Sequence, residues 1–286
     1  MNEIVDAFLK QYAPDPDGQQ LGRQIKRRHQ LMRGCYLLML LVGVLLVSRF
    51  GFWGIIAGVL LLAAGAVLLR LEQDRSMALL QDCLLQQCDP AMAATAFITC
   101  QKAFWKGAHT AGCIDLARNL HLMGARELAE QVLELVQNGP FSSQNYLNFC
   151  TVQAHIATDD GDADTVRAVL DTLNRWKSER DKKVDAQKKE QIHRLRRTLT
   201  FLKGKYDTYI AQMRGQKQRT PYGQVCAGYY VGRAYLEMGD LTAAGEQFAC
   251  VTELGGKMEL ALICQKLLQE ARRQDESGES ADEREQ

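Results

Sequence analysis

The chain has 286 residues, 47% of them hydrophobic, and its formal net charge at pH 7 is only +1. This balance argues against nucleic-acid binding, which needs a strongly basic surface to neutralise phosphates. Nine cysteines are scattered without the paired spacing of a disulfide framework, and Cys83 and Cys88 have no matching second pair for a zinc site. We therefore expect free thiols in a reducing compartment, and no bound metal or cofactor.

Residues 1–30 are predicted to be a cytoplasmic N-terminal segment. They begin with a short amphipathic stretch that contains Ile4, Phe8 and Tyr12 and ends at the turn-forming sequence that starts with Pro14. This stretch is expected either to lie in a membrane interface or to dock on the rest of the chain.

Two apolar stretches, residues 34–48 and 50–69, are separated only by Arg49. A bilayer hydrocarbon core about 30 Å thick needs about 20 apolar residues per helix. We therefore predict a transmembrane helical hairpin over residues 31–71. One alternative is a buried hairpin of a soluble core, but core helices are rarely apolar around their whole circumference. The other is a cleaved signal peptide, which would not run straight into a second apolar stretch.

The cations that flank the predicted hairpin indicate its orientation. Several precede it or follow it, whereas the tip holds only Arg49; the flanking cations are Arg23, Lys26, Arg27, Arg28, Arg33, Arg70 and Arg75. The positive-inside rule then places both termini in the cytoplasm, with the protein integral to a plasma or inner membrane. Gly54, Gly58 and Gly65 lie on one face of the second stretch, where they favour close helix contact, either within the hairpin or between two copies.

Residues 72–273 are predicted to form an all-α domain, because apolar residues recur at intervals of three and four and strand signals are weak. Pro90, Pro140 and Pro221 fall where helices are expected to begin or end. The acidic tail, residues 274–286, is expected to be disordered.

The domain contains an internal repeat. Its clearest copy has Gly232, Tyr235, Gly239, Ala244 and Phe248, and earlier copies include Ala117, Leu120, Gly124, Ala129 and Leu133, then Ala154, Ala157, Gly161, Val166 and Leu170. Gly124, Gly161, Gly204 and Gly239 follow one another at intervals of 37, 43 and 35 residues. This pattern resembles the tetratricopeptide repeat, a helical hairpin of about 34 residues. The resemblance implies an α-solenoid that binds proteins or peptides; a generic helical bundle is the alternative.

The resemblance also implies a concave groove lined by the first helix of each hairpin. The residues expected to face this groove are Ile114, Arg118, His121, Thr151, His155, Tyr229, Arg233 and Leu236. Two arginines at equivalent repeat positions would suit an acidic peptide, because a guanidinium binds carboxylates in a bidentate manner. The family's carboxylate-clamping members have lysine and asparagine where this chain has Ile114 and Arg118. Alternatively, the arginines are ordinary solvated residues or internal ion-pair partners.

Residues 175–203 form a basic segment, which we expect to be an elongated helix projecting from its repeat between Trp176 and Leu195. Three interpretations compete: a solvated helix laced with salt bridges, contact with anionic lipid, and nucleic-acid binding, which the overall charge disfavours.

We find no phosphate-binding loop, zinc-protease pair or nucleophile elbow, so no catalytic residue is predicted and the protein is not expected to be an enzyme. The sequence thus favours a membrane-anchored scaffold that binds a protein or peptide partner at the cytoplasmic face. The alternative is a membrane-associated enzyme or sensor with a small-molecule or anionic-lipid site in the repeat domain.

Overall fold

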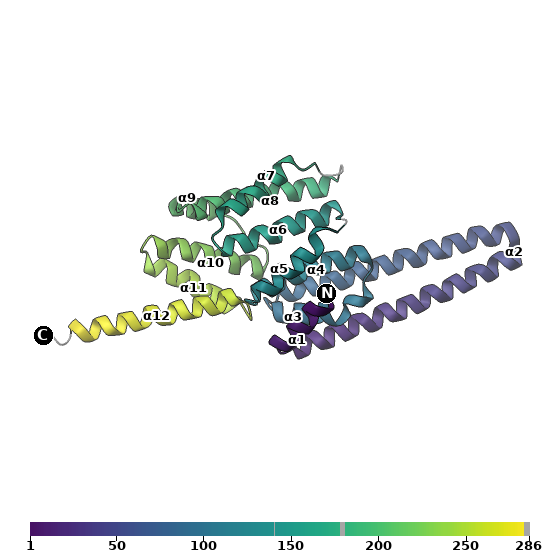
Figure 1. The fold of residues 1–286 in the computed structure, drawn as a ribbon, viewed down its shortest axis with the longest axis horizontal. Coiled ribbons are helices and arrows are strands. Elements are labelled where there is room, and N and C mark those ends of the chain that lie inside the picture. Colours follow the sequence, from purple (N-terminus) through teal and green to yellow (C-terminus); the bar gives the residue numbers. More distant parts are fainter. Residues whose placement is uncertain (140, 178–180, 283–286) are drawn as a thin grey trace.

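The computed structural model describes residues 1–139, 141–177 and 181–282, and the described chain is all-helical, as predicted (Figure 1). Its helices are α1 (Asn2–Gln11), α2 (Pro16–Leu85), α3 (Pro90–Cys100), the 3₁₀ helix η1 (Gln101–Ala103), α4 (Lys106–Leu122), α5 (Arg126–Gln137), α6 (Ser143–Asp159), α7 (Ala163–Arg175), α8 (Lys182–Leu202), α9 (Tyr206–Met213), α10 (Pro221–Glu237), α11 (Leu241–Leu254) and α12 (Glu259–Asp282).

The long helix α2 reverses direction at Gly51, whose φ of 54° and ψ of −125° are not helical. Its two arms lie side by side in Figure 1. Small residues permit this contact: a Cβ atom on Gly54 would lie 2.0 Å from the carbonyl oxygen of Leu46, and one on Gly58 would lie 3.6 Å from the Cα of Gly43. The glycines of the second arm therefore serve helix contact within one molecule.

The distal part of α2 is apolar and exposed. Its most apolar window of 18 residues has a mean hydropathy of 2.5 and is only 22% buried, so α2 is long and apolar enough to cross a membrane. The exposed side chains include Leu31, Leu37, Leu38, Leu41, Val44, Leu45, Phe50, Phe52, Trp53, Val59, Leu60, Val67 and Leu71.

The base of α2 belongs to the helical domain. Its first arm lies so close to α3 that a Cβ on Gly18 or Gly22 would come within 2.6 Å of a carbonyl oxygen of α3. The N-terminal helix α1 docks beside α5, with Phe8 only 1% exposed. The amphipathic N-terminal stretch thus packs on the domain.

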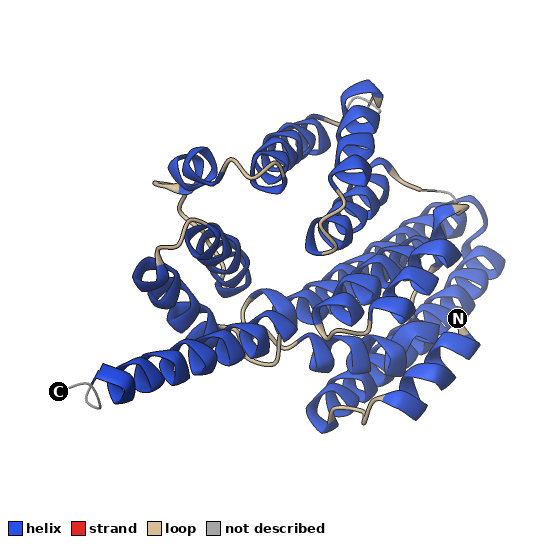
Figure 2. Ribbon diagram, turned by 60° about the vertical axis from the view of Figure 1, so that its left-hand side comes forward, coloured by secondary structure: helices blue, strands red, loops and turns tan. Residues whose placement is uncertain are grey.

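Four helical hairpins follow: α4–α5, α6–α7, α8–α9 and α10–α11. Each turns at a glycine with positive φ, namely Gly124 (81°), Gly161 (75°), Gly204 (69°) and Gly239 (80°). Only glycine adopts this left-handed conformation without steric cost, which explains the regular spacing of these residues in the sequence. Figure 2 shows the hairpins following one another round an arc.

Small residues also bring the two helices of the last hairpin together. A Cβ on Gly232 would lie 2.5 Å from the Phe248 ring, and both Ala244 and Phe248 are buried. Tyr235 is half-buried beside the same cluster. In the first hairpin, Ala129 of α5 is fully buried against α4.

The last hairpin packs back against the base of α2 and closes the arc. Leu84 of α2 and Leu122 of α4 share one apolar cluster with Val225, Phe248 and Met258. An ionic contact borders this cluster: the Lys257 amine lies 2.7 Å from both Asp15 and Asp89. These aspartates are the N-caps of α2 and α3, so a single lysine in the loop between α11 and α12 contacts two helix starts.

Two segments differ from expectation. The basic segment does not project: α8 is the first helix of the third hairpin and contacts α6, α7 and α9. Its Val184, Leu195 and Leu199 are buried in one cluster with residues of α6 and α7. The acidic tail, expected to be disordered, is helical as far as Asp282, where α12 ends. Residues 283–286 of the expected disordered tail lie outside the described residues.

Replacing Gly232 by alanine should destabilise the domain, because the added methyl group meets the buried Phe248 ring. We expect the free energy of unfolding, measured by denaturant titration of the chain in detergent, to fall by about 1–3 kcal/mol. Gly245→Ala is the matched control: its Cβ would contact only Leu268, at 4.0 Å, so higher helix propensity should leave stability unchanged or raise it by up to about 1 kcal/mol. An equal fall in the free energy of unfolding in both variants would contradict the close contact between Gly232 and Phe248.

The Lys257 contact should make stability depend on acid pH. Burial alone would raise the pKa of Asp15, but the hydrogen bond from Lys257 and backbone amides lower it below 3.8. The stabilisation is therefore present above about pH 4 and is lost as pH falls through the lower folded pKa. In Lys257→Met, the free energy of unfolding at pH 7 should fall by up to about 1 kcal/mol. The further decrease in stability between about pH 4 and pH 2 should be smaller in this variant than in the parent protein. The exposed Lys266→Met should retain the parental pH profile, measured by thermal denaturation.

Candidate functional site

A cavity of about 250 Å³ lies on the inner side of the arc, between the second arm of α2 and helices α3, α4, α6 and α8. Its apolar floor includes Leu80, Leu84 and Phe97. Its polar lining is mainly carboxamides, with one acid and one base: Gln81, Asp115, Arg118, Asn119, Gln144, Asn148 and Gln187. The cavity thus combines apolar surface with groups that both donate and accept hydrogen bonds.

The polar groups of the cavity are held in a partly paired arrangement. Asp115 accepts a hydrogen bond of 2.9 Å from Gln81 and forms an ion pair of 3.1 Å with Arg118. The Gln144 amide donates to Asn148 at 3.1 Å. The side-chain oxygen of Asn119 is buried without a hydrogen-bond partner in the described chain. An unpaired buried acceptor is costly, so this oxygen is a polar atom that the described packing leaves unsatisfied.

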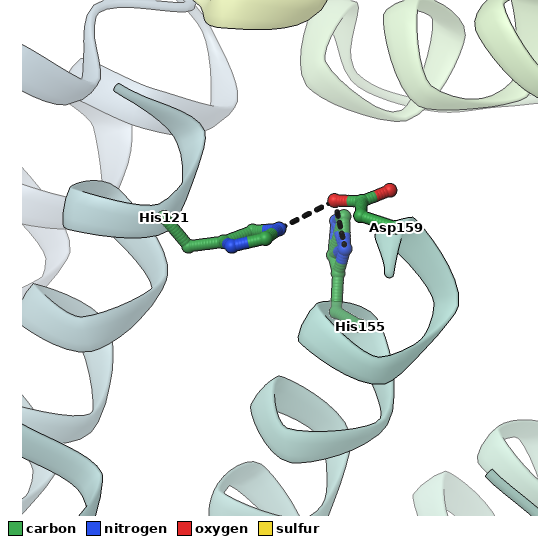
Figure 3. A group of neighbouring side chains, drawn as sticks. All are labelled: His121, His155 and Asp159. Carbon is green, nitrogen blue, oxygen red and sulfur yellow. Dashed lines mark hydrogen bonds and ion pairs between the residues drawn. The ribbon is translucent and has the colours of Figure 1, made fainter. Parts of the chain in front are cut away.

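A second polar cluster lies one helical turn beyond Arg118. His121 comes from the end of α4, whereas His155 and Asp159 lie one turn apart on α6 (Figure 3). The Asp159 Oδ2 atom is 2.5 Å from His121 Nε2 and 3.6 Å from His155 Nδ1. His121 is only 3% exposed. Three potential metal ligands therefore converge on one point, all within 4.8 Å of one another.

Two tyrosines of α10 reach this cluster from across the arc. The Tyr230 hydroxyl donates to Oδ1 of Asp159, and the Tyr222 hydroxyl lies 3.4 Å from His155 Nε2. Burial lowers the pKa of His155 to about 4, so its imidazole is neutral at physiological pH. Burial would raise the pKa of Asp159, but the hydrogen bond from His121 and the neighbouring His155 lower it overall. The cluster thus presents a carboxylate beside a neutral imidazole.

Three of the residues predicted to face a groove lie on the inner side of the arc. Arg118 lines the cavity, and His121 and His155 form the neighbouring cluster. Ile114, in contrast, is fully buried in the main hydrophobic core, where no ligand reaches it. The Thr151 hydroxyl donates to the Leu147 carbonyl of its own helix.

The residues predicted on the last repeat lie elsewhere. Arg233 is 3.2 Å from the Tyr229 hydroxyl and pairs with Glu237, and it does not line the cavity. Leu236 packs against the C-terminal apolar cluster. The structure therefore does not bring Arg118 and Arg233 into one binding site.

Sequence reasoning missed Asp159, Tyr222, Tyr230 and the carboxamides of the cavity. The spacing of His155 and Asp159, four residues apart on a predicted helix, was an available signal. Nothing in the sequence indicated the role of the two tyrosines, because each contacts a residue of α6 that is about 70 positions away in the chain.

No family model, curated protein or solved structure matches this chain. Its function must therefore be inferred from its own geometry.

The contact between Tyr230 and Asp159 should contribute measurably to stability. Tyr230→Phe removes a donor to a buried carboxylate, so the free energy of unfolding should fall by about 1–3 kcal/mol. In an Asp159→Asn background the same change should cost less, because the charged acceptor is gone. A double-mutant cycle in denaturant measures this coupling, with the neighbouring exposed Asp160→Asn as the control background. Equal costs in all three backgrounds would contradict the contact.

Proposed function

We propose that this chain is a membrane-anchored helical-repeat adaptor that binds an extended segment of a protein partner at the cytoplasmic membrane face. The observation that carries the proposal is the inner cavity, where carboxamides and Arg118 surround an apolar floor beside the base of α2. Four points support it: the anchor, its orientation, the repeat architecture and the chemistry of the cavity.

The free part of α2 has the dimensions of a membrane anchor. Residues 31–50 and 52–71 are 20 residues on each side of Gly51, and a helix rises 1.5 Å per residue, so each arm spans about 30 Å. This length equals the thickness of a bilayer hydrocarbon core. A core helix of a soluble protein would be covered, whereas Leu38, Phe52 and Trp53 are 62%, 70% and 73% exposed. Two membrane spans account for this exposure.

The distribution of cations supports two cytoplasmic termini. Arg23, Arg27 and Arg28 precede the free arms and Arg75 follows them, all on the side of the helical domain. Only Arg49 lies at the tip of the hairpin. By the positive-inside rule the domain then lies in the cytoplasm, with almost nothing exposed on the opposite side.

The helical hairpins support a repeat architecture. Four hairpins, each turned by a left-handed glycine, follow one another round an arc, in keeping with the tetratricopeptide resemblance. Stacks of this kind use their concave side to bind extended chains. The cavity lies on that side, lined by residues of α4, α6 and α8, which are first helices of their hairpins.

The chemistry of the cavity favours a peptide. A carboxamide pairs in a complementary manner with the N–H and C=O of an extended backbone, and side chains of the ligand can rest on the apolar floor. Arg118 is 19% exposed and already shared with Asp115, so it can exchange that partner for an acidic residue of the ligand. Anchoring at the membrane would raise the effective concentration of a membrane-bound partner.

An anion-binding sensor is a second candidate, for which the structure offers one specific feature. A hollow of about 340 Å³ on α8 and α9 is lined by His193, Arg196, Arg197, Thr200, Gln212 and Gln216. In Figure 1, α9 lies at the end of the domain far from the tip of α2. This position suits a soluble anion better than a bilayer lipid.

The adaptor proposal is tested by proximity labelling in intact cells, with the labelling enzyme fused to the C-terminus. We expect a short, reproducible set of cytoplasmic or membrane proteins. Arg118→Glu together with Asn148→Ala should remove part of this set, because the first change reverses the charge of the cavity and the second removes a carboxamide. Arg126→Glu on α5, an exposed arginine that pairs with Asp160, is the matched control and should leave the set unchanged.

Labelling that is unaffected by the cavity variants would contradict peptide binding in the cavity. An empty set from a correctly inserted protein would favour the anion-binding alternative, which Arg196→Glu with Arg197→Glu would then test. Labelling of proteins from the opposite side of the membrane would overturn the proposed orientation.

A further inference from the structure

We propose that His121, His155 and Asp159 form a binding site for a divalent transition-metal ion, with Zn²⁺ as the best match. This inference goes beyond the adaptor function and does not depend on it.

The donor set is that of a transition-metal site. Two imidazoles and one carboxylate are the ligand types that zinc binds in proteins, whereas magnesium and calcium prefer oxygen ligands alone. His155 and Asp159 are separated by one helical turn, so both project from the same face of α6, and His121 completes the set from α4 (Figure 3). A zinc ion bound by three protein ligands keeps a fourth position for water.

The separations are close to those that a metal requires. Zinc bonds of about 2.0–2.2 Å place neighbouring ligand atoms of a tetrahedral site about 3.3 Å apart. Oδ2 of Asp159 is already 3.6 Å from His155 Nδ1. Its distance to His121 Nε2 is 2.5 Å, so the pair must open by less than about 1 Å to admit the ion. Side-chain rotation is sufficient for such a change.

Hydrogen bonds alone leave this cluster incompletely satisfied. His155 Nδ1 is too far from Asp159 for a hydrogen bond, and His121 Nδ1 is buried without a partner in the described chain. A bound ion would use Nε2 of His121, so the unpaired Nδ1 is the ring atom left for an outer partner. The ion would contact His155 Nδ1 and balance the buried charge of Asp159.

The surroundings provide the second shell that such sites need. The Tyr230 hydroxyl binds Oδ1 of Asp159 and leaves Oδ2 for the ion, and Tyr222 contacts His155 Nε2 and leaves Nδ1. Outer contacts of this kind orient ligands and tune metal affinity. Through them a bound ion would tie α4 and α6 to α10, which lies across the arc, and would stiffen the wall next to the cavity.

The experiment uses the full chain in detergent, stripped with a chelator and kept under a reducing agent. Metal content is measured after equilibration with Zn²⁺ and dialysis, and thermal unfolding is followed with Zn²⁺ or Mg²⁺. We expect about one equivalent of zinc, and a higher melting temperature with Zn²⁺ but not with Mg²⁺. His155→Ala and Asp159→Asn should each weaken zinc affinity at least about 100-fold, and Tyr230→Phe about 10–100-fold.

His193→Ala and Asp160→Asn are the matched controls, because both residues are exposed and neither belongs to the cluster. They should bind zinc like the parent protein. Nine cysteines occur in the chain and remain in every variant, so zinc retained by His155→Ala and Asp159→Asn would mean binding to thiols and would overturn the proposal. Absence of zinc binding by the folded parent protein would also overturn it. Circular dichroism without metal shows whether each variant folds. If a ligand variant does not fold, Tyr230→Phe still tests the site, because it keeps all three ligands.

Discussion

The close packing of the α2 base against the helical domain is the constraint on which the rest of the structure depends. It requires glycine where any side chain would collide with a backbone: a Cβ on Gly18 or Gly22 would meet carbonyl oxygens of α3. The next layer is equally tight, because a Cβ on Gly112 of α4 would meet the Phe97 ring of α3. Because both arms continue as helix from the apolar part into this base, the hairpin and the domain share the same two helical arms. The cavity includes Leu80 and Leu84 of the second arm, so its position relative to the hairpin follows directly from this packing.

Closure of the arc is the second organising feature. A line of helical hairpins is held together only by neighbouring contacts, and its ends are free. Here the last hairpin returns to the base of α2 through an apolar cluster and through Lys257, which binds the caps of two helices. This packing of the last hairpin brings Tyr222 and Tyr230 of α10 next to α6, where they complete the polar cluster around Asp159. The two candidate sites therefore share a wall: Arg118 and Asn119 line the cavity, and His121 follows on the same helix.

The two proposed properties are compatible in physical terms. A peptide-binding cavity benefits from rigid walls, because ordering flexible side chains on binding costs free energy. A metal ion between α4 and α6 would restrict two of the helices that line the cavity.

The sequence by itself determined the helical class, the apolar hairpin residues and the positions of the four turns. These features depend on local chemistry: the spacing of apolar residues, the length of an apolar run, and the left-handed conformation that favours Gly124, Gly161, Gly204 and Gly239. Only the tertiary structure decided which inner residues meet. It placed Ile114 in the core, separated Arg233 from Arg118, and joined His121 to Asp159 and Tyr230. The physical reason is that these contacts depend on the curvature of the arc and on its closure, which arise from many small packing terms between residues far apart in the sequence.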